Sequence, residues 1–167
     1  MFTQMKNTYL LQNAITLNSN GFKYDVTATS IDIPEIKKHK DQFGFDFVAL
    51  KKKGLFVYKI CRCNEEDILQ GLVCFVPNMG ILDCYNMEMN NFNKRGSSVY
   101  NGVGKCMVAL CCKISFDLGF QGFITFEAKS KLVPYYERLG AKRISYIRMA
   151  IDSGVAKKLV DIYFKKD

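Results

Sequence analysis

The spacing of apolar residues changes near residue 100 and divides the chain into two parts. Before this point, segments 45–50, 55–62, 68–76 and 81–89 are short, apolar and strand-like, and polar turns separate them. The clearest turn is Pro77-Asn78-Met79-Gly80, because proline presets φ and glycine tolerates a positive φ. Four strands with short connections predict an antiparallel meander.

Beyond residue 100 the apolar positions recur with the period of a helix, which Gly119 is placed to end. The apolar face comprises Val103, Met107, Leu110, Cys111, Ile114 and Leu118. Segment 122–127 reads as a short strand, 131–139 as a second helix closed by Gly140, and 144–151 as another strand. A helix between strands predicts a parallel crossover. The fold class is therefore mixed α/β, with an antiparallel meander feeding a βαβ unit.

The two ends carry weaker signals. Residues 9–17 could form an apolar helix face, residues 22–33 alternate like a strand, and Pro34 opens a short basic helix to residue 42. At the other end, Asp152 and Ser153 cap a last helix with one apolar side, made of Val155, Leu159, Ile162 and Tyr163. We expect a single domain over residues 1–167, with a core at 45–151 and a C-terminal helix at 152–167.

Composition narrows the class of protein. The 167 residues are 49% hydrophobic and 24% charged, as in ordinary globular domains. No apolar run approaches the roughly 20 residues of a membrane span, and the N-terminus lacks the features of a signal peptide, so we expect a cytoplasmic protein. Seven cysteines in apolar surroundings indicate reduced core thiols. Without a CxxC pair, and with His39 as the one histidine, neither a metal site nor a catalytic Cys–His pair is favoured.

The net charge of +8 attracts anions of any kind, so it does not separate nucleic acid from a phosphorylated cofactor. Lysines are spread along the chain, at 37–40, 51–53, 157–158 and 165–166, without interleaved aromatic residues. This distribution favours a solvated surface over a nucleic-acid interface.

The sharpest local feature is Asn101-Gly102-Val103-Gly104-Lys105-Cys106, between the meander and the long helix. Two glycines let backbone N–H groups turn toward one centre, and a helix start adds unpaired donors and partial positive charge. The loop therefore suits a phosphate or pyrophosphate. Two glycines that only let the chain enter a helix are the alternative.

The order of segments sharpens this interpretation. The two glycines, the long helix, a short strand and then Tyr135-Tyr136-Glu137-Arg138-Leu139-Gly140-Ala141 together resemble the GNAT superfamily of acyl-CoA-dependent N-acyltransferases. Members carry a (Q/R)xxGx(G/A) pyrophosphate loop and, one strand later, a segment like FYxxLGF. The resemblance covers about residues 45–151.

The resemblance implies a splayed sheet with flanking helices, in which acetyl-CoA lies between the fourth meander strand and the strand after the long helix. Its pantetheine would pair with the backbone near Met87, Glu88 and Met89, and its pyrophosphate would lie at 101–106. The implied activity is direct transfer of the acetyl group to a primary amine, with residues 1–44 on the acceptor side. The acceptor, and the choice between monomer and homodimer, stay open.

The resemblance also assigns chemical roles. Tyr136 matches the family's general acid, and a phenol with a pKa of about 10 stays protonated at neutral pH. Packing beside Tyr135 is the alternative. Glu88 could act as the base through a water molecule or be a solvated strand residue, and Glu127 is the reserve candidate.

Two departures from the family pattern concern the cofactor contacts. Val99 replaces the Gln or Arg that begins the loop, where Lys105 would supply charge instead. Lys129 stands where many members have a cofactor-binding Asn; it could approach a phosphate of the cofactor but would not duplicate the hydrogen bond of Asn. Two other functions remain open. One is an acetyltransferase acting on aminoacyl-tRNA, as toxin-like relatives do; the other is a module that binds acyl-CoA without turnover.

Overall fold

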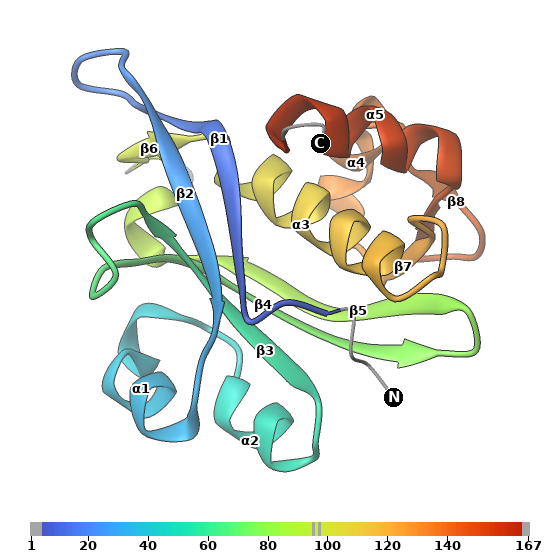
Figure 1. Cartoon of the computed structure of the whole chain (residues 1–167), viewed down its shortest axis with the longest axis horizontal. Coiled ribbons are helices and arrows are strands. Elements are labelled where there is room, and N and C mark those ends of the chain that lie inside the picture. Colours follow the sequence, from blue (N-terminus) through green and yellow to red (C-terminus); the bar gives the residue numbers. More distant parts are fainter. Residues whose placement is uncertain (1–4, 95, 97, 165–167) are drawn as a thin grey trace.

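The computed structural model describes residues 5–94, 96 and 98–164, over which nine strands form one sheet in the order β6-β1-β2-β3-β4-β5-β7-β9-β8 (Figure 1). Helices α1 and α2 cover one face, and α3, α4 and α5 cover the other (Figure 1). No helix in the described ranges is long and apolar enough to cross a membrane. Residues 1–4 lie outside the described residues. So do Lys165 and Lys166, for which a solvated surface was predicted.

Five consecutive strands form an antiparallel meander: β1 (Thr8–Leu17), β2 (Lys23–Ser30), β3 (Phe56–Arg62), β4 (Leu69–Asn78) and β5 (Ile81–Met89). The predicted helix at 9–17 is therefore wrong. A bulge shifts the register between Leu11 and Ile15, where Asn13 has a φ of 48°. Because the bulge breaks the two-residue alternation, neighbouring apolar residues are both buried, which mimics a helical pattern.

Two short helices lie between β2 and β3. The predicted basic helix is confirmed as α1 (Ile33–Lys38), followed by a 3-10 turn (Lys40–Gln42). The predicted strand at 45–50 is wrong, because this segment begins α2 (Phe47–Lys52). The Asp46 side chain caps α2 by accepting a 3.0 Å hydrogen bond from the Ala49 N–H, which stabilises a helix start.

The predicted crossover is confirmed: α3 (Val103–Asp117) joins β5 to β7 (Ile124–Glu127), and these two strands pair in parallel. The second crossover differs. After a 3-10 turn (Ser130–Leu132), α4 (Val133–Arg138) leads to β8 (Lys142–Arg143) and β9 (Arg148–Ile151), and β9 pairs antiparallel with β7.

The C-terminal helix is confirmed as α5 (Ser153–Tyr163), and Asp152 caps it. Its buried face comprises Ala156, Leu159 and Tyr163, whereas Ile162 is 54% exposed and does not belong to it as predicted.

The cysteines agree with the prediction of reduced core thiols. All seven are free, and all except the half-buried Cys63 are buried. Burial raises the pKa of Cys61 and Cys74 to about 12, so both stay protonated and unreactive at neutral pH. Within the described residues, no cluster of His, Cys, Asp and Glu could hold a metal ion.

Candidate functional site

Strands β5 and β7 separate after Cys84. They pair only from Leu82–Ile124 to Cys84–Phe126, although β5 continues to Met89. Tyr85 is an extra residue opposite β4, because Cys74 pairs with Asn86 and Phe75 pairs with Cys84. Such a bulge increases strand twist. In the described structure, the edge of β5 at residues 85–89 therefore has no strand partner on the β7 side.

The start of α3 lies over this open end of β5. Gly71 of β4 pairs with Met89, and a β-carbon on Gly71 would lie 2.9 Å from Met107 Sδ and 3.4 Å from Val103 Cγ1. Glycine at this position lets the first turns of α3 approach the sheet closely. The open strand edge and the helix N-terminus are thus at the same end of the molecule.

Gly102 fixes the loop that enters α3. It is the N-cap residue with a φ of 95°, and a β-carbon there would lie 3.0 Å from the Ala14 carbonyl oxygen of β1. The preceding residue, Asn101, belongs to β6 (Tyr100–Asn101) and pairs with Thr16 of β1. The loop backbone is therefore held against the bulged part of β1.

The first turn of α3 presents backbone donors. The Cys106 N–H donates to the Gly102 carbonyl oxygen at 3.0 Å. Those of Val103, Gly104 and Lys105 have no partner among the described residues, as expected for a helix start. Three such donors beside the Lys105 ammonium suit an anionic ligand. The buried Cys106 thiol instead donates to the Ala14 carbonyl oxygen at 3.6 Å, so this side chain faces β1.

Tyr136 lies where the two strands separate. Its ring centroid is 4.7 Å from that of Phe126, near the end of β7. Burial raises the pKa of Tyr136 to about 12, with smaller contributions from Tyr135 and from Cys84 of β5. The phenol is therefore protonated throughout the physiological pH range.

Tyr135 of α4 lies against the start of α3, a contact that was missed from the sequence. Its ring is 5.2 Å from that of Tyr136, and its hydroxyl would be 3.0 Å from a β-carbon on Gly104. Sequence reasoning treated Tyr135 as a packing partner, and the adjacency of two tyrosines at a helix start was the one available signal.

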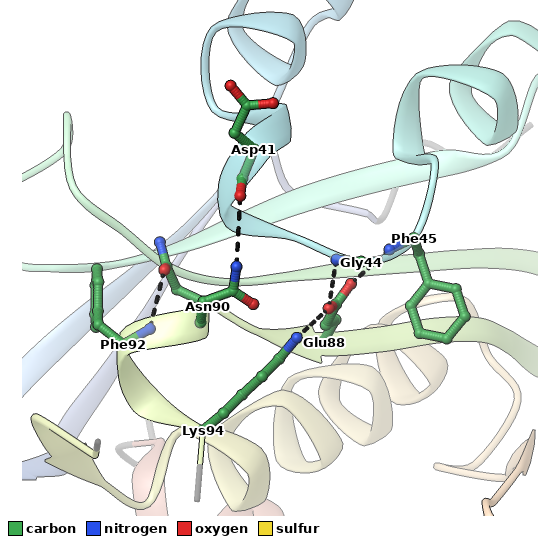
Figure 2. Close-up of polar contacts among 8 residues, drawn as sticks. Asp41, Gly44, Phe45, Glu88, Asn90, Phe92 and Lys94 are labelled. Carbon is green, nitrogen blue, oxygen red and sulfur yellow. Dashed lines mark hydrogen bonds and ion pairs between the residues drawn. The ribbon is translucent and has the colours of Figure 1, made fainter. Parts of the chain in front are cut away.

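Glu88 points away from α3, toward the segment before α2. Its side chain is 7% exposed, and Oε2 accepts hydrogen bonds from the Gly44 N–H at 2.7 Å and from Lys94 Nζ at 2.5 Å (Figure 2). Oε1 accepts from the Phe45 N–H at 3.0 Å (Figure 2). Both oxygens are thus occupied by donors, unlike those of a solvated strand residue.

A cleft of about 190 Å³ lies at the separation of the strands, lined by Asp83, Cys84, Tyr85, Glu127 and Arg148. The Arg148 guanidinium donates to Asp83 Oδ1 at 2.7 Å and lies 3.7 Å from Glu127 Oε1. The Glu127 side chain is 62% exposed, so its carboxylate is open to solvent beside the cleft.

Lys129 connects the two sides of the opening. It follows the end of β7, and its Nζ lies 5.8 Å from the ring centroid of Phe45, which precedes α2. This distance is within the range of a cation–π interaction. The ammonium group therefore faces the α1–α2 segment.

No protein-family model matches the sequence, and no curated protein matches it. Solved structures do. A protein of Desulfovibrio desulfuricans assigned to the GNAT family of acetyltransferases aligns with a TM-score of 0.55 and 16% identity, over 77% of this chain and 99% of that chain. The spermidine/spermine N-acetyltransferase SpeG of Vibrio cholerae aligns with a TM-score of 0.60 and 12% identity, over 80% and 98% of the two chains.

A mutant AtaT toxin bound to acetyl-CoA and to the C-terminus of the antitoxin AtaR aligns with a TM-score of 0.58 and 13% identity, over 81% of this chain and 98% of that chain. At such identities the likeness establishes the fold. The chain has the GNAT acetyltransferase fold, as the sequence predicted.

Proposed function

We propose that the protein is an acetyl-CoA-dependent N-acetyltransferase that transfers the acetyl group directly to a primary amine. The observation that carries the proposal is the open edge of β5 beside the first turn of α3. An unpaired strand edge can hydrogen-bond an extended amide-containing chain, and a helix start can bind a pyrophosphate. Acetyl-CoA contains both groups, and a structure of the same fold binds it.

The residues present fit this ligand. The N–H groups of Val103, Gly104 and Lys105 would hold the pyrophosphate beside Asn101 and the Lys105 ammonium. The backbone of Met87 and Met89 would pair with the pantetheine. The Asn90 N–H donates to the Gln70 carbonyl oxygen on the β4 side at 2.9 Å. Backbone directions alternate along a strand, so the backbone groups of Met89 and Met87 face the open edge. Bound acetyl-CoA supplies the thioester, and the protein orients it.

Tyr136 is the residue proposed to act on the departing sulfur, because its ring packs on Phe126 at the point where the strands separate. With its pKa raised to about 12, the phenol is a weaker acid than a thiol. It therefore donates a hydrogen bond that stabilises the departing thiolate, a charge that develops only in the transition state.

Glu127 is the better placed of the two candidate bases. Its carboxylate is exposed beside the cleft, so it can accept a proton from the amine through a water molecule. The Glu88 oxygens already accept three hydrogen bonds, two of them from backbone N–H groups. Proton acceptance at Glu88 would remove the negative charge that strengthens all three bonds.

A macromolecular acceptor is the second candidate, and it is favoured because a toxin is among the proteins that share the fold. The net charge of +8 is compatible with an aminoacyl-tRNA, as it is with any anion. Polyamines are the contrasting acceptor class, because SpeG acts on spermidine and spermine.

Two measurements test the proposal. Saturating acetyl-CoA should raise the unfolding free energy, by about 2.7 kcal/mol at one hundred times its dissociation constant. Thiol release is then followed with polyamines, peptides with free N-termini and aminoacyl-tRNA. An unchanged melting midpoint would refute the cofactor assignment. Binding without thiol release, and with no acetylated product by mass spectrometry, would indicate a non-catalytic acyl-CoA module.

A further inference from the structure

A set of hydrogen bonds joins the end of β5 to the segment before α2 (Figure 2). We call the contacts of Glu88 with Gly44, Phe45 and Lys94 the latch. Next to the latch, Asn90 Nδ2 donates to Gln42 Oε1 at 2.8 Å, which holds the same two segments together. The latch therefore belongs to a wider polar contact between the α1–α2 segment and the strand that the proposed function places against acetyl-CoA.

We propose that Glu88 is a positioning residue that holds Phe45 across the opening between β5 and β7, where Phe45 forms the acceptor-side wall. This inference rests on the proposed function, because only an acetyl transfer gives Phe45 an acceptor to contact. In this role Glu88 binds the backbone N–H groups of Gly44 and Phe45 and does not take a proton from the amine. A buried carboxylate needs hydrogen-bond donors, and here three are supplied.

Gly44 is explained by the latch. A β-carbon on Gly44 would lie 3.2 Å from Glu88 Oε2, closer than ordinary van der Waals contact. The φ of Gly44 lies outside the positive range that favours glycine, so the small residue is needed for space. An alanine here would push the carboxylate away without changing Glu88 itself.

Phe45 is held from three sides. Its N–H is bound by Glu88 of β5, its ring meets the buried Phe47 ring edge-on at 6.4 Å, and Lys129 lies over its ring at 5.8 Å. Glu88 belongs to β5, and Lys129 follows β7. Because these two strands enclose the opening, a residue held by both lies across it, and Phe45 remains 41% exposed there.

Lys94 connects the latch to the loop that precedes α3. It lies in the loop that runs from β5 to Gly102, and its ammonium shares Glu88 Oε2 with the Gly44 N–H. One carboxylate thus connects the acceptor-side wall with the loop that precedes the proposed cofactor site. Loss of the latch should weaken acceptor binding most and acetyl-CoA binding less.

Three variants test the latch: Glu88→Gln, Gly44→Ala and Lys94→Met. Backbone amide hydrogen exchange of Gly44 and Phe45 is measured by NMR in each, with and without acetyl-CoA. Glu88→Gln should lower the protection of both amides at least about tenfold, because a hydrogen bond to a charged acceptor is lost. Gly44→Ala and Lys94→Met keep Glu88 and should lower protection by smaller factors.

Steady-state kinetics with the amine found by the thiol-release screen give the second readout. All three variants should raise the acceptor KM, by about tenfold for Glu88→Gln, with kcat and the acid limb of its pH profile little changed. Glu65→Gln is the matched control, because this partly exposed carboxylate pairs with Arg62 at 3.7 Å outside the latch. It should leave every readout unchanged.

Specific outcomes would overturn the proposal. If Glu88→Gln lowered kcat a hundredfold and removed the acid limb while both amides kept their protection, Glu88 would be the base. Wild-type protection and KM in Gly44→Ala and Lys94→Met would equally refute the latch. Hydrogen exchange needs no substrate. It can therefore refute the latch whether or not the protein proves to be an acetyltransferase.

Discussion

The Tyr135 hydroxyl lies over Gly104 at the start of α3, 3.0 Å from the position that a β-carbon of Gly104 would take. Tyr135 and Tyr136 therefore face different parts of the proposed site from one turn of α4. Tyr135 contacts the helix start, and Tyr136 packs on Phe126 where the strands separate. The short helix thus joins the two parts of the site.

This contact gives a prediction for the double variant Gly104→Ala/Tyr135→Phe. Removing the hydroxyl makes room for the new methyl group, and alanine favours a helix over glycine by about 1 kcal/mol. We expect unchanged or higher stability in urea, but acetyl-CoA affinity at least about tenfold lower by calorimetry, because the methyl group covers the backbone donors. Wild-type affinity in this stable variant would make the glycines a helix entry only.

Tyr136→Phe should lower kcat by about a hundredfold, as for the loss of one hydrogen-bond donor to a transition-state charge, and leave the KM for acetyl-CoA nearly unchanged. Phenylalanine keeps the packing on Phe126, so the change isolates the hydroxyl. The initial rate of thiol release at saturating amine and acetyl-CoA gives kcat, and a melting curve checks the fold. An unaltered kcat would show that Tyr136 only packs.

Alkaline pH should destabilise the protein. Burial raises the pKa of Tyr58 and Tyr136 to about 12, whereas an unfolded tyrosine ionises near pH 10. Between these values the unfolded state loses protons that the folded state keeps, so the unfolding free energy falls as pH rises. The contribution of the two tyrosines to the unfolding free energy is complete only below pH 10. Each tyrosine contributes a slope approaching about 1.4 kcal/mol per pH unit.

Urea titrations from pH 9 to 11.5 measure this slope, and Tyr136→Phe should reduce it. In the same range kcat should show no loss caused by ionisation of Tyr136, because the folded phenol stays protonated. A slope identical in wild type and Tyr136→Phe would mean that the phenol is not held protonated by burial.

Gly102→Ala should destabilise the fold and weaken acetyl-CoA binding. Gly102 combines a φ of 95° with the close Ala14 carbonyl, whereas Gly54 has a φ of 91° with nothing within 4 Å of its β-carbon position. Gly54→Ala is therefore the matched control for the backbone conformation alone, with a cost of about 1–2 kcal/mol. Gly102→Ala should cost more, and it alone should lower acetyl-CoA affinity. Equal effects of the two variants would mean that the contact with β1 does not shape the loop.

Strands β3, β4 and β5 and the crossover through α3 to β7 were predictable because their signals are local. The apolar period of α3 and the glycine that follows it determine one helix, and the order of motifs around it identified the fold. Strand β1 was misread because the bulge at Asn13 breaks the alternation of buried residues. Helix α2 was misread because six residues are too few to separate a helical from a strand period, although Asp46 offered a capping signal.

The candidate site also contains residues that the sequence could identify and residues that it could not. The glycines at 102 and 104 and Tyr136 could be found from the sequence because they lie in ordered motifs. The Glu88 contacts could not, because Gly44 and Phe45 are far from it in the chain and meet it only after the sheet forms. A carboxylate on a strand does not reveal which backbone groups will reach it.

The pairing of β1 with β6 has a consequence for the nascent chain. Thr16 leaves the ribosome before its partner Asn101, which is synthesised 85 residues later (101 − 16 = 85). Until then β1 has β2 on one side and a bare edge on the other, which is open to mispairing with other chains. Pairing with β6 covers this edge at Thr16 and Leu17 and also lays Gly102 against Ala14. The pairing that covers this end of β1 is therefore also the pairing that shapes the loop before α3.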